Sequence, residues 1–124
     1  MFRYYNPNPV GRSTVGDCAV RALSKVLDIS WERAYRMLSD NAFKMGDMPS
    51  SNSVMGSVLR QHGFYRENLP PTCPDCYTIG DFCRDNPIGT YLVGSDNHVV
   101  AVKNGAIFDT WDSSGEPILY FWTR

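Results

Sequence analysis

The chain has 124 residues, of which 43% are hydrophobic, and a formal net charge of −1 at pH 7. A chain of this length can bury roughly two-thirds of its unfolded surface, so we expect a single domain over residues 1–124. The balanced charge argues against a nucleic-acid partner, and the lack of a signal-like start or of an apolar run of about 18 residues favours a cytoplasmic protein that does not bind membranes.

Three amphipathic helices are predicted in the first half of the chain, after an irregular or extended segment at residues 2–16 that contains Pro7, Pro9, Gly11 and Gly16. Each helix has a recognisable beginning or end. The first spans about residues 17–27, the second follows an N-cap at Ser30 and ends before a loop at 41–52, and the third is capped by Ser51 or Asn52 and ends at Gly63.

The second half of the chain is mainly β-structure. A short strand is expected at 64–67, a turn-rich loop at 70–76, and a short helix capped by Thr78 that ends before Pro87. Strands are then predicted at 90–93, 98–103, 106–110 and 117–122. Helices first and consecutive strands last are typical of an α+β fold, here N-terminal helices packed on one side of a C-terminal antiparallel sheet.

Cys18 lies where a glycine-containing lead-in becomes the first helix. Free N–H groups and the helix dipole at an N-terminus stabilise a thiolate, which is the reactive form of cysteine. A cysteine in the first helical turn can therefore be a nucleophile if a base lies nearby. Considered alone, a cysteine on the apolar side of a helix is more often an inert core residue.

His98 and Asp109 belong to a predicted hairpin whose turn is Asn104-Gly105, a strong signal for a two-residue turn. In that register the paired residue numbers sum to 209, so His98 lies opposite Trp111 and diagonal to Asp109 on one face, with α-carbons about 7–8 Å apart. Asp109 can then orient the histidine, and Trp111 can shield their contact from water. A backbone-bonded His98 and a turn-capping Asp109 are the plain alternatives.

The segments Asp17-Cys18-Ala19-Val20-Arg21-Ala22-Leu23, His98-Val99-Val100-Ala101-Val102 and Asp109-Thr110-Trp111-Asp112 resemble the papain-like cysteine peptidases, in particular small bacterial and phage proteins near the C39 bacteriocin-processing peptidases. The resemblance implies a papain-like fold and a thiol protease with the catalytic triad Cys18, His98 and Asp109, in the roles of nucleophile, general base and orienting acid. It further implies a hydrolase of amide or isopeptide bonds that acts on a peptide or protein and needs no cofactor.

One position departs from the family pattern. Papain-like enzymes usually have a glutamine about six residues before the cysteine, where its amide binds the oxyanion, and this chain has Arg12 there. Arg12 and Thr14 are the candidate oxyanion donors, with Asn6, Asn8 and the backbone N–H of Cys18 as further options.

Two other readings stay open. The first is a non-catalytic papain-like domain that binds a peptide or protein in the same cleft, and the second is a small module ordered by metal at Cys73 and Cys76. Because a second closely spaced pair is missing, we expect no metal site, and we expect Cys73 and Cys76 to be unpaired loop thiols. Cys83 is expected to be a packing residue, and His62 a solvated one.

Overall fold

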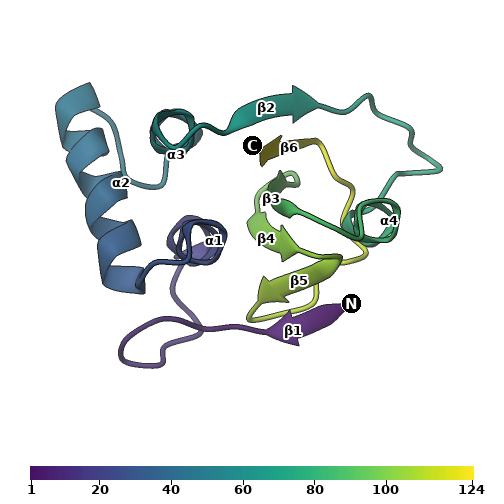
Figure 1. The fold of residues 1–124 in the computed structure, drawn as a ribbon, viewed down its shortest axis with the longest axis horizontal. Coiled ribbons are helices and arrows are strands. Elements are labelled where there is room, and N and C mark those ends of the chain that lie inside the picture. Colours follow the sequence, from purple (N-terminus) through teal and green to yellow (C-terminus); the bar gives the residue numbers. More distant parts are fainter.

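The computed structural model describes residues 1–124 and has an α+β fold with four helices and one six-stranded mixed sheet (Figure 1). The elements in chain order are β1 (Phe2–Tyr4), α1 (Cys18–Leu27), α2 (Trp31–Met45), α3 (Asn52–Gln61), β2 (Tyr65–Asn68), α4 (Ile79–Asp85), β3 (Thr90–Gly94), β4 (Val99–Lys103), β5 (Ala106–Asp109) and β6 (Tyr120–Thr123).

The strands lie in the order β1-β5-β4-β3-β6-β2, and every pair is antiparallel except β1 with β5. The prediction of a wholly antiparallel C-terminal sheet, with residues 2–16 irregular, is therefore wrong at β1. The breakers begin only at Pro7, and the residues before it include three aromatic side chains, which favour a strand. This segment covers the edge of β5, with Phe2 opposite Ile107.

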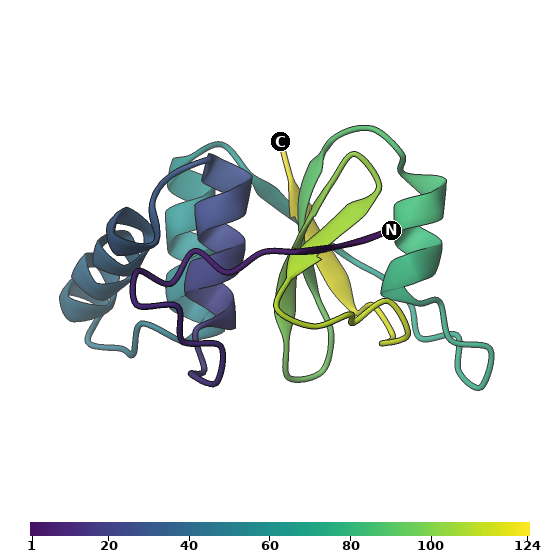
Figure 2. The ribbon, with the colours of Figure 1, turned by 90° about the horizontal axis from the view of Figure 1, so that it is seen from below.

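Helices cover both faces of the sheet. In Figure 2 helices α1 to α3 lie on one side and α4 on the other, so the prediction of helices on one side holds only for the first three. The physical reason is visible in β4, where four consecutive residues from Val99 to Val102 are buried, the pattern of a strand covered on both faces. The core under α1 to α3 includes Leu23, Leu38, Leu59, Leu92 and Trp122, and the core under α4 includes Ile79, Phe82, Val100, Val102 and Ile107.

The predicted helix caps are confirmed. The side-chain oxygen of Ser30 accepts from Arg33 N at 3.1 Å, and Ser51 caps α3 in the same way. Thr78 and Asp81 form a capping box at the start of α4. The predicted end of α2 before residue 41 is wrong: the helix continues through residues 41–45 to Gly46, which ends it in the left-handed region at φ 67°.

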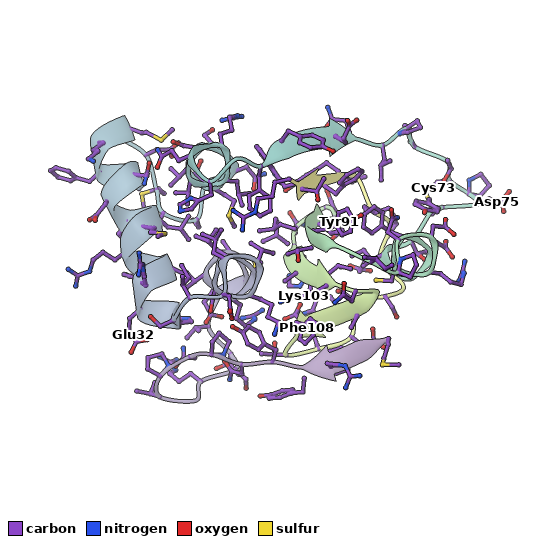
Figure 3. All side chains as sticks on the ribbon, in the orientation of Figure 1. Glu32, Cys73, Asp75, Tyr91, Lys103 and Phe108 are labelled. Atoms are coloured by element: carbon purple, nitrogen blue, oxygen red, sulfur yellow. A yellow bond between two sulfur atoms is a disulfide. The ribbon has the colours of Figure 1, made fainter.

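The loop before α4 contains a disulfide between Cys73 and Cys76, so the prediction of unpaired thiols there is wrong. A spacing of three residues in a turn brings the α-carbons to 4.1 Å, close enough for a bond. Figure 3 shows Cys73 and Asp75 at the outer end of this loop, far from α1. Cys18 and Cys83 are free. No helix combines the length and the apolar character needed to cross a membrane.

Candidate functional site: a cysteine, a histidine and a buried charge network

Cys18 is the first residue of α1, as the sequence predicts, and its side chain is partly buried. The N-cap is Asp17, whose carboxylate makes no capping hydrogen bond to the helix backbone. The backbone N–H of Cys18 has no protein partner, as is usual for the first residues of a helix. The thiol therefore lies beside an unpaired donor at the positive end of a ten-residue helix.

His98 immediately precedes β4, and Asp109 is the last residue of β5. The predicted register is confirmed, because Ala101 pairs with Phe108 and Lys103 with Ala106. Both turn residues have positive φ, 50° at Asn104 and 76° at Gly105, as a type I′ hairpin requires. This turn fixes which residues of the two strands face each other.

The hairpin brings His98 and Asp109 into direct contact, with 2.5 Å between His98 Nε2 and Asp109 Oδ2. Since Nε2 is engaged in this way, Nδ1 is the ring nitrogen that remains for Cys18. A carboxylate on one nitrogen fixes the orientation of the ring and stabilises its protonated form.

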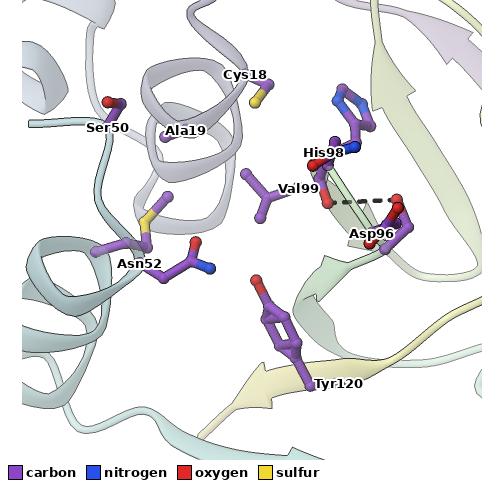
Figure 4. A pocket seen from close by; sticks show the side chains of 11 residues that line it. Cys18, Ala19, Ser50, Asn52, Asp96, His98, Val99 and Tyr120 are labelled. Carbon is purple, nitrogen blue, oxygen red and sulfur yellow. Dashed lines mark hydrogen bonds between the residues drawn. The ribbon is translucent and has the colours of Figure 1, made fainter.

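Cys18 and His98 line the same pocket, which has a volume of about 220 Å³ (Figure 4). Four parts of the chain form its wall: the beginning of α1, the beginning of α3, the turn between β3 and β4 with the first residue of β4, and the first residue of β6. The other lining residues are Ala19, Ser50, Asn52, Met55, Ser95, Asp96, Asn97, Val99 and Tyr120.

The ionisation of the cysteine and the histidine is shifted in opposite directions. Burial alone raises the pKa of Cys18, but hydrogen bonding with His98 and the Val99 N–H outweighs burial, and the pKa of Cys18 is lowered. Burial also works against the charged imidazole, yet Asp109 and Cys18 together raise the pKa of His98 to about 9. These shifts favour a thiolate beside an imidazolium at neutral pH.

Asp109 is held by more than His98. Burial raises the pKa of Asp109, but hydrogen bonds from His98 and from the Thr110 N–H outweigh burial. The net pKa is lowered, and the carboxyl stays ionised. Arg21 Nη2 also donates to Asp109 Oδ1 at 2.9 Å, and the Arg21 guanidinium bonds the Asp17 carboxylate on its other side. Trp31 Nε1 donates to the remaining Asp17 oxygen at 2.9 Å, which completes the network.

Arg21 and Asp17 were not among the predicted site residues. The signal was present, because the two are four apart on one helix, a spacing that brings an acidic and a basic side chain together. Arg21 also lies three residues after Cys18, on the same side of α1, in a stretch that is otherwise apolar. A charged residue that is buried in an apolar stretch needs a partner of opposite charge. The sequence alone does not show that Asp109 is this partner.

The two predicted side-chain oxyanion donors do not line the pocket. Arg12 and Thr14 are both exposed, and Arg12 instead borders a separate hollow formed with Trp31 and Tyr35. Two backbone N–H groups remain as candidates: that of Cys18 has no protein partner, and that of Val99 forms a hydrogen bond with the thiol.

Trp111 and His62 have different surroundings. The rings of Trp111 and His98 have centroids 4.8 Å apart and planes tilted by 41°, so the indole covers one face of the imidazole while remaining 45% exposed itself. His62 lies at the end of α3, where its Nδ1 is 2.9 Å from the Val58 carbonyl oxygen, outside the pocket. No group of three or more His, Cys, Asp or Glu side chains is arranged to hold a metal ion.

Comparison with known proteins identifies no relative of this chain. No protein-family model matches the chain, and no curated protein or solved structure is significantly similar to it.

Proposed function

We propose that this protein is a cysteine peptidase-like hydrolase of amide or isopeptide bonds, with Cys18 as nucleophile, His98 as general base and acid, and Asp109 as the residue that orients His98. One observation carries the proposal: the Cys18 thiol and the His98 imidazole share a pocket, and the far nitrogen of that imidazole contacts a buried carboxylate at 2.5 Å. Nucleophilic catalysis by cysteine uses a base near the thiol and a third group that orients the base, and these three residues would fill those roles.

The reaction has two halves. The Cys18 thiolate attacks the carbonyl carbon and forms a carbon–sulfur bond, while backbone N–H groups at the start of α1 stabilise the oxyanion. The carbon–nitrogen bond then breaks as His98 gives its proton to the leaving amine. Water, deprotonated by His98, hydrolyses the thioester, which releases a carboxylic acid and restores the thiol.

The papain-like family is part of this proposal. The α+β fold supports it, with the cysteine at the first residue of a helix that packs on the sheet and the histidine at the beginning of a strand. The mixed sheet, the parallel β1 and the helix on the opposite face are features that a papain-like assignment must accommodate.

The first test is the pH dependence of alkylation by iodoacetamide, followed for each cysteine by mass spectrometry of peptides. An ordinary thiol with a pKa of about 8.5 loses reactivity about tenfold per pH unit below that value. We expect the rate for Cys18 to fall much less steeply than this below pH 8, because contact with His98 lowers the pKa of its thiol. Cys83 is the internal control, since burial raises the pKa of its thiol.

The second test separates hydrolysis from binding alone. The wild-type protein and Cys18→Ala are incubated with a mixture of peptides, and new peptide ends are identified by mass spectrometry. Cleavage by the wild type only supports the proposal. Peptide binding without cleavage, combined with an ordinary pH profile for Cys18, would instead favour the non-catalytic domain.

A further inference from the structure

Tyr120, on β6, is a buried residue whose hydroxyl has no hydrogen-bond partner in the protein. The residue is 7% exposed, it lines the pocket, and its hydroxyl points into the pocket beside Asn52 (Figure 4). A group bound in the pocket can therefore reach this hydroxyl and become its hydrogen-bond partner. Burial raises the pKa of Tyr120, so the hydroxyl keeps its proton at neutral pH and can act as a donor to a bound group.

The ring that carries this hydroxyl lies against Gly94, which pairs with Tyr120 across β3 and β6. A β-carbon at position 94 would lie 2.1 Å from Tyr120 Cζ and within 2.4 Å of both neighbouring ring carbons. The ring can therefore rest on the backbone of β3 only because residue 94 is glycine. The Arg66 guanidinium lies 3.9 Å from the ring centroid and restrains the ring further.

The N-terminus of α3 forms the neighbouring wall of the pocket. Ser51 accepts from Ser53 N at 3.2 Å, whereas the backbone N–H groups of Asn52 and Val54 have no protein partner. Unpaired N–H groups at the start of a ten-residue helix favour a negative charge. The exposed Asn52 side-chain amide, which is also free of protein partners, lines the same pocket as Tyr120 (Figure 4).

Two groups bring negative charge to the pocket, the Cys18 thiolate and Asp96. Asp96 is the only carboxylate in the lining, and it is exposed on the turn between β3 and β4. Figure 4 shows it apart from Asn52 and Tyr120, on the His98 side. The α3 side of the pocket thus presents hydrogen-bond donors and the positive end of a helix.

We infer that Tyr120, Asn52 and the start of α3 form a subsite for a carboxylate, so that the preferred substrate has a Glu or Asp side chain adjacent to the bond that is attacked. This inference rests on the proposed function, since it names the substrate of the same pocket. The volume of about 220 Å³ suits one side chain and is below the roughly 300–1,000 Å³ of pockets that hold larger ligands.

Three alkylating probes test the subsite without requiring turnover: N-bromoacetyl-glutamic acid amide, its glutamine analogue and its leucine analogue. In each, Cys18 displaces bromide and forms a carbon–sulfur bond, and only the side chain differs. We expect the glutamic acid probe to label Cys18 at least about tenfold faster than either analogue, because a hydrogen bond to a charged group is worth about 1.5–3 kcal/mol. Tyr120→Phe, which keeps the ring on Gly94, should remove most of this preference, and Asn52→Ala should reduce it.

Tyr91→Phe is the matched control, because the Tyr91 hydroxyl contacts the Ile88 carbonyl at the surface and lies outside the pocket. It should leave the preference unchanged. Equal labelling by the three probes, or a preference that survives in Tyr120→Phe, would overturn the subsite. The iodoacetamide pH profile reports separately on the thiol. If Cys18 is activated but shows no preference among the probes, only the subsite is contradicted. If Cys18 reacts as an ordinary thiol, the proposed function is contradicted.

Discussion

Arg21 and Asp109 form a buried ion pair that joins α1 to the end of β5, with 2.9 Å between Arg21 Nη2 and Asp109 Oδ1. The two residues are 88 positions apart, and the same carboxylate contacts His98 through its other oxygen. The helix that carries the thiol is thus tied to the hairpin that carries the imidazole. The relative position of the two reactive groups depends on a contact that includes neither of them.

Replacing Arg21 with methionine should strongly destabilise the protein. Arg21 is 5% exposed and lies between the Asp17 and Asp109 carboxylates, so its removal leaves the buried Asp17 without a counter-charge and Asp109 with His98 alone. Breaking one side of a buried pair typically costs about 3–5 kcal/mol. We expect a loss of that order in the free energy of unfolding, measured by urea denaturation with circular dichroism.

Arg84→Met is the matched control for this change. Arg84 pairs with Asp81 at 2.6 Å, but its side chain is 73% exposed, and surface pairs of this kind contribute little. The control should unfold at nearly the same urea concentration as the wild type. Equal stability of the two variants would contradict a structural role for the Arg21 pair.

The titration of His98 provides a second prediction. The contacts with Asp109 and Cys18 raise the pKa of His98 to about 9. The imidazole should therefore stay protonated at pH 7 and lose its proton only as the pH rises through about 9. Both Cys18→Ala and Asp109→Asn should lower this pKa, because each removes a negative partner. Imidazole resonances followed by NMR between pH 5 and 10 measure it.

His62→Gln assigns the spectrum, since the chain contains only two histidines. A His98 that titrates near its ordinary value of about 6.5 in the wild type would contradict the ion pair. A His98 pKa that is the same in Asp109→Asn as in the wild type would show that the contact between the two residues does not govern the charge.

The hairpin was predictable because its information is local. Asn104-Gly105 determines the turn, the turn determines the register, and the register puts His98 and Asp109 on one face. The start of α1 at Cys18 was equally local, because a glycine-containing segment precedes it and helical spacing of apolar residues follows it. Local patterns of spacing and turn chemistry therefore located the three residues of the proposed triad.

What could not be predicted depends on contacts between distant segments. Nothing near Arg21 shows that its partner is Asp109, and nothing near Tyr120 shows that its ring rests on Gly94. The parallel pairing of β1 with β5 likewise joins the first residues of the chain to a strand more than a hundred residues later. The position of α4 could have been inferred, because the continuous burial of β4 requires cover on both faces.

Replacing Gly94 with alanine is the third prediction. The added methyl group would collide with three ring carbons of Tyr120, so the ring must move from β3. We expect a loss of about 1–3 kcal/mol in the free energy of unfolding, as for other overpacked sites. The preference for the glutamic acid probe should also fall. Gly115→Ala is the control, because no atom lies within 4 Å of a β-carbon there, and it should change neither measurement.

The last prediction concerns the four cysteines, which should divide into two pairs with different chemistry. Cys73 and Cys76 are bonded to each other, whereas Cys18 and Cys83 are free. Alkylation of the denatured protein without a reducing agent should modify only Cys18 and Cys83, and reduction beforehand should expose all four thiols to the reagent. Since the disulfide lies in the loop before α4 and does not line the pocket, its reduction should leave the alkylation rate of native Cys18 unchanged. A Cys18 rate that changes on reduction in the wild type but not in a Cys73→Ser/Cys76→Ser variant, which has no disulfide to reduce, would contradict the independence of the two sites.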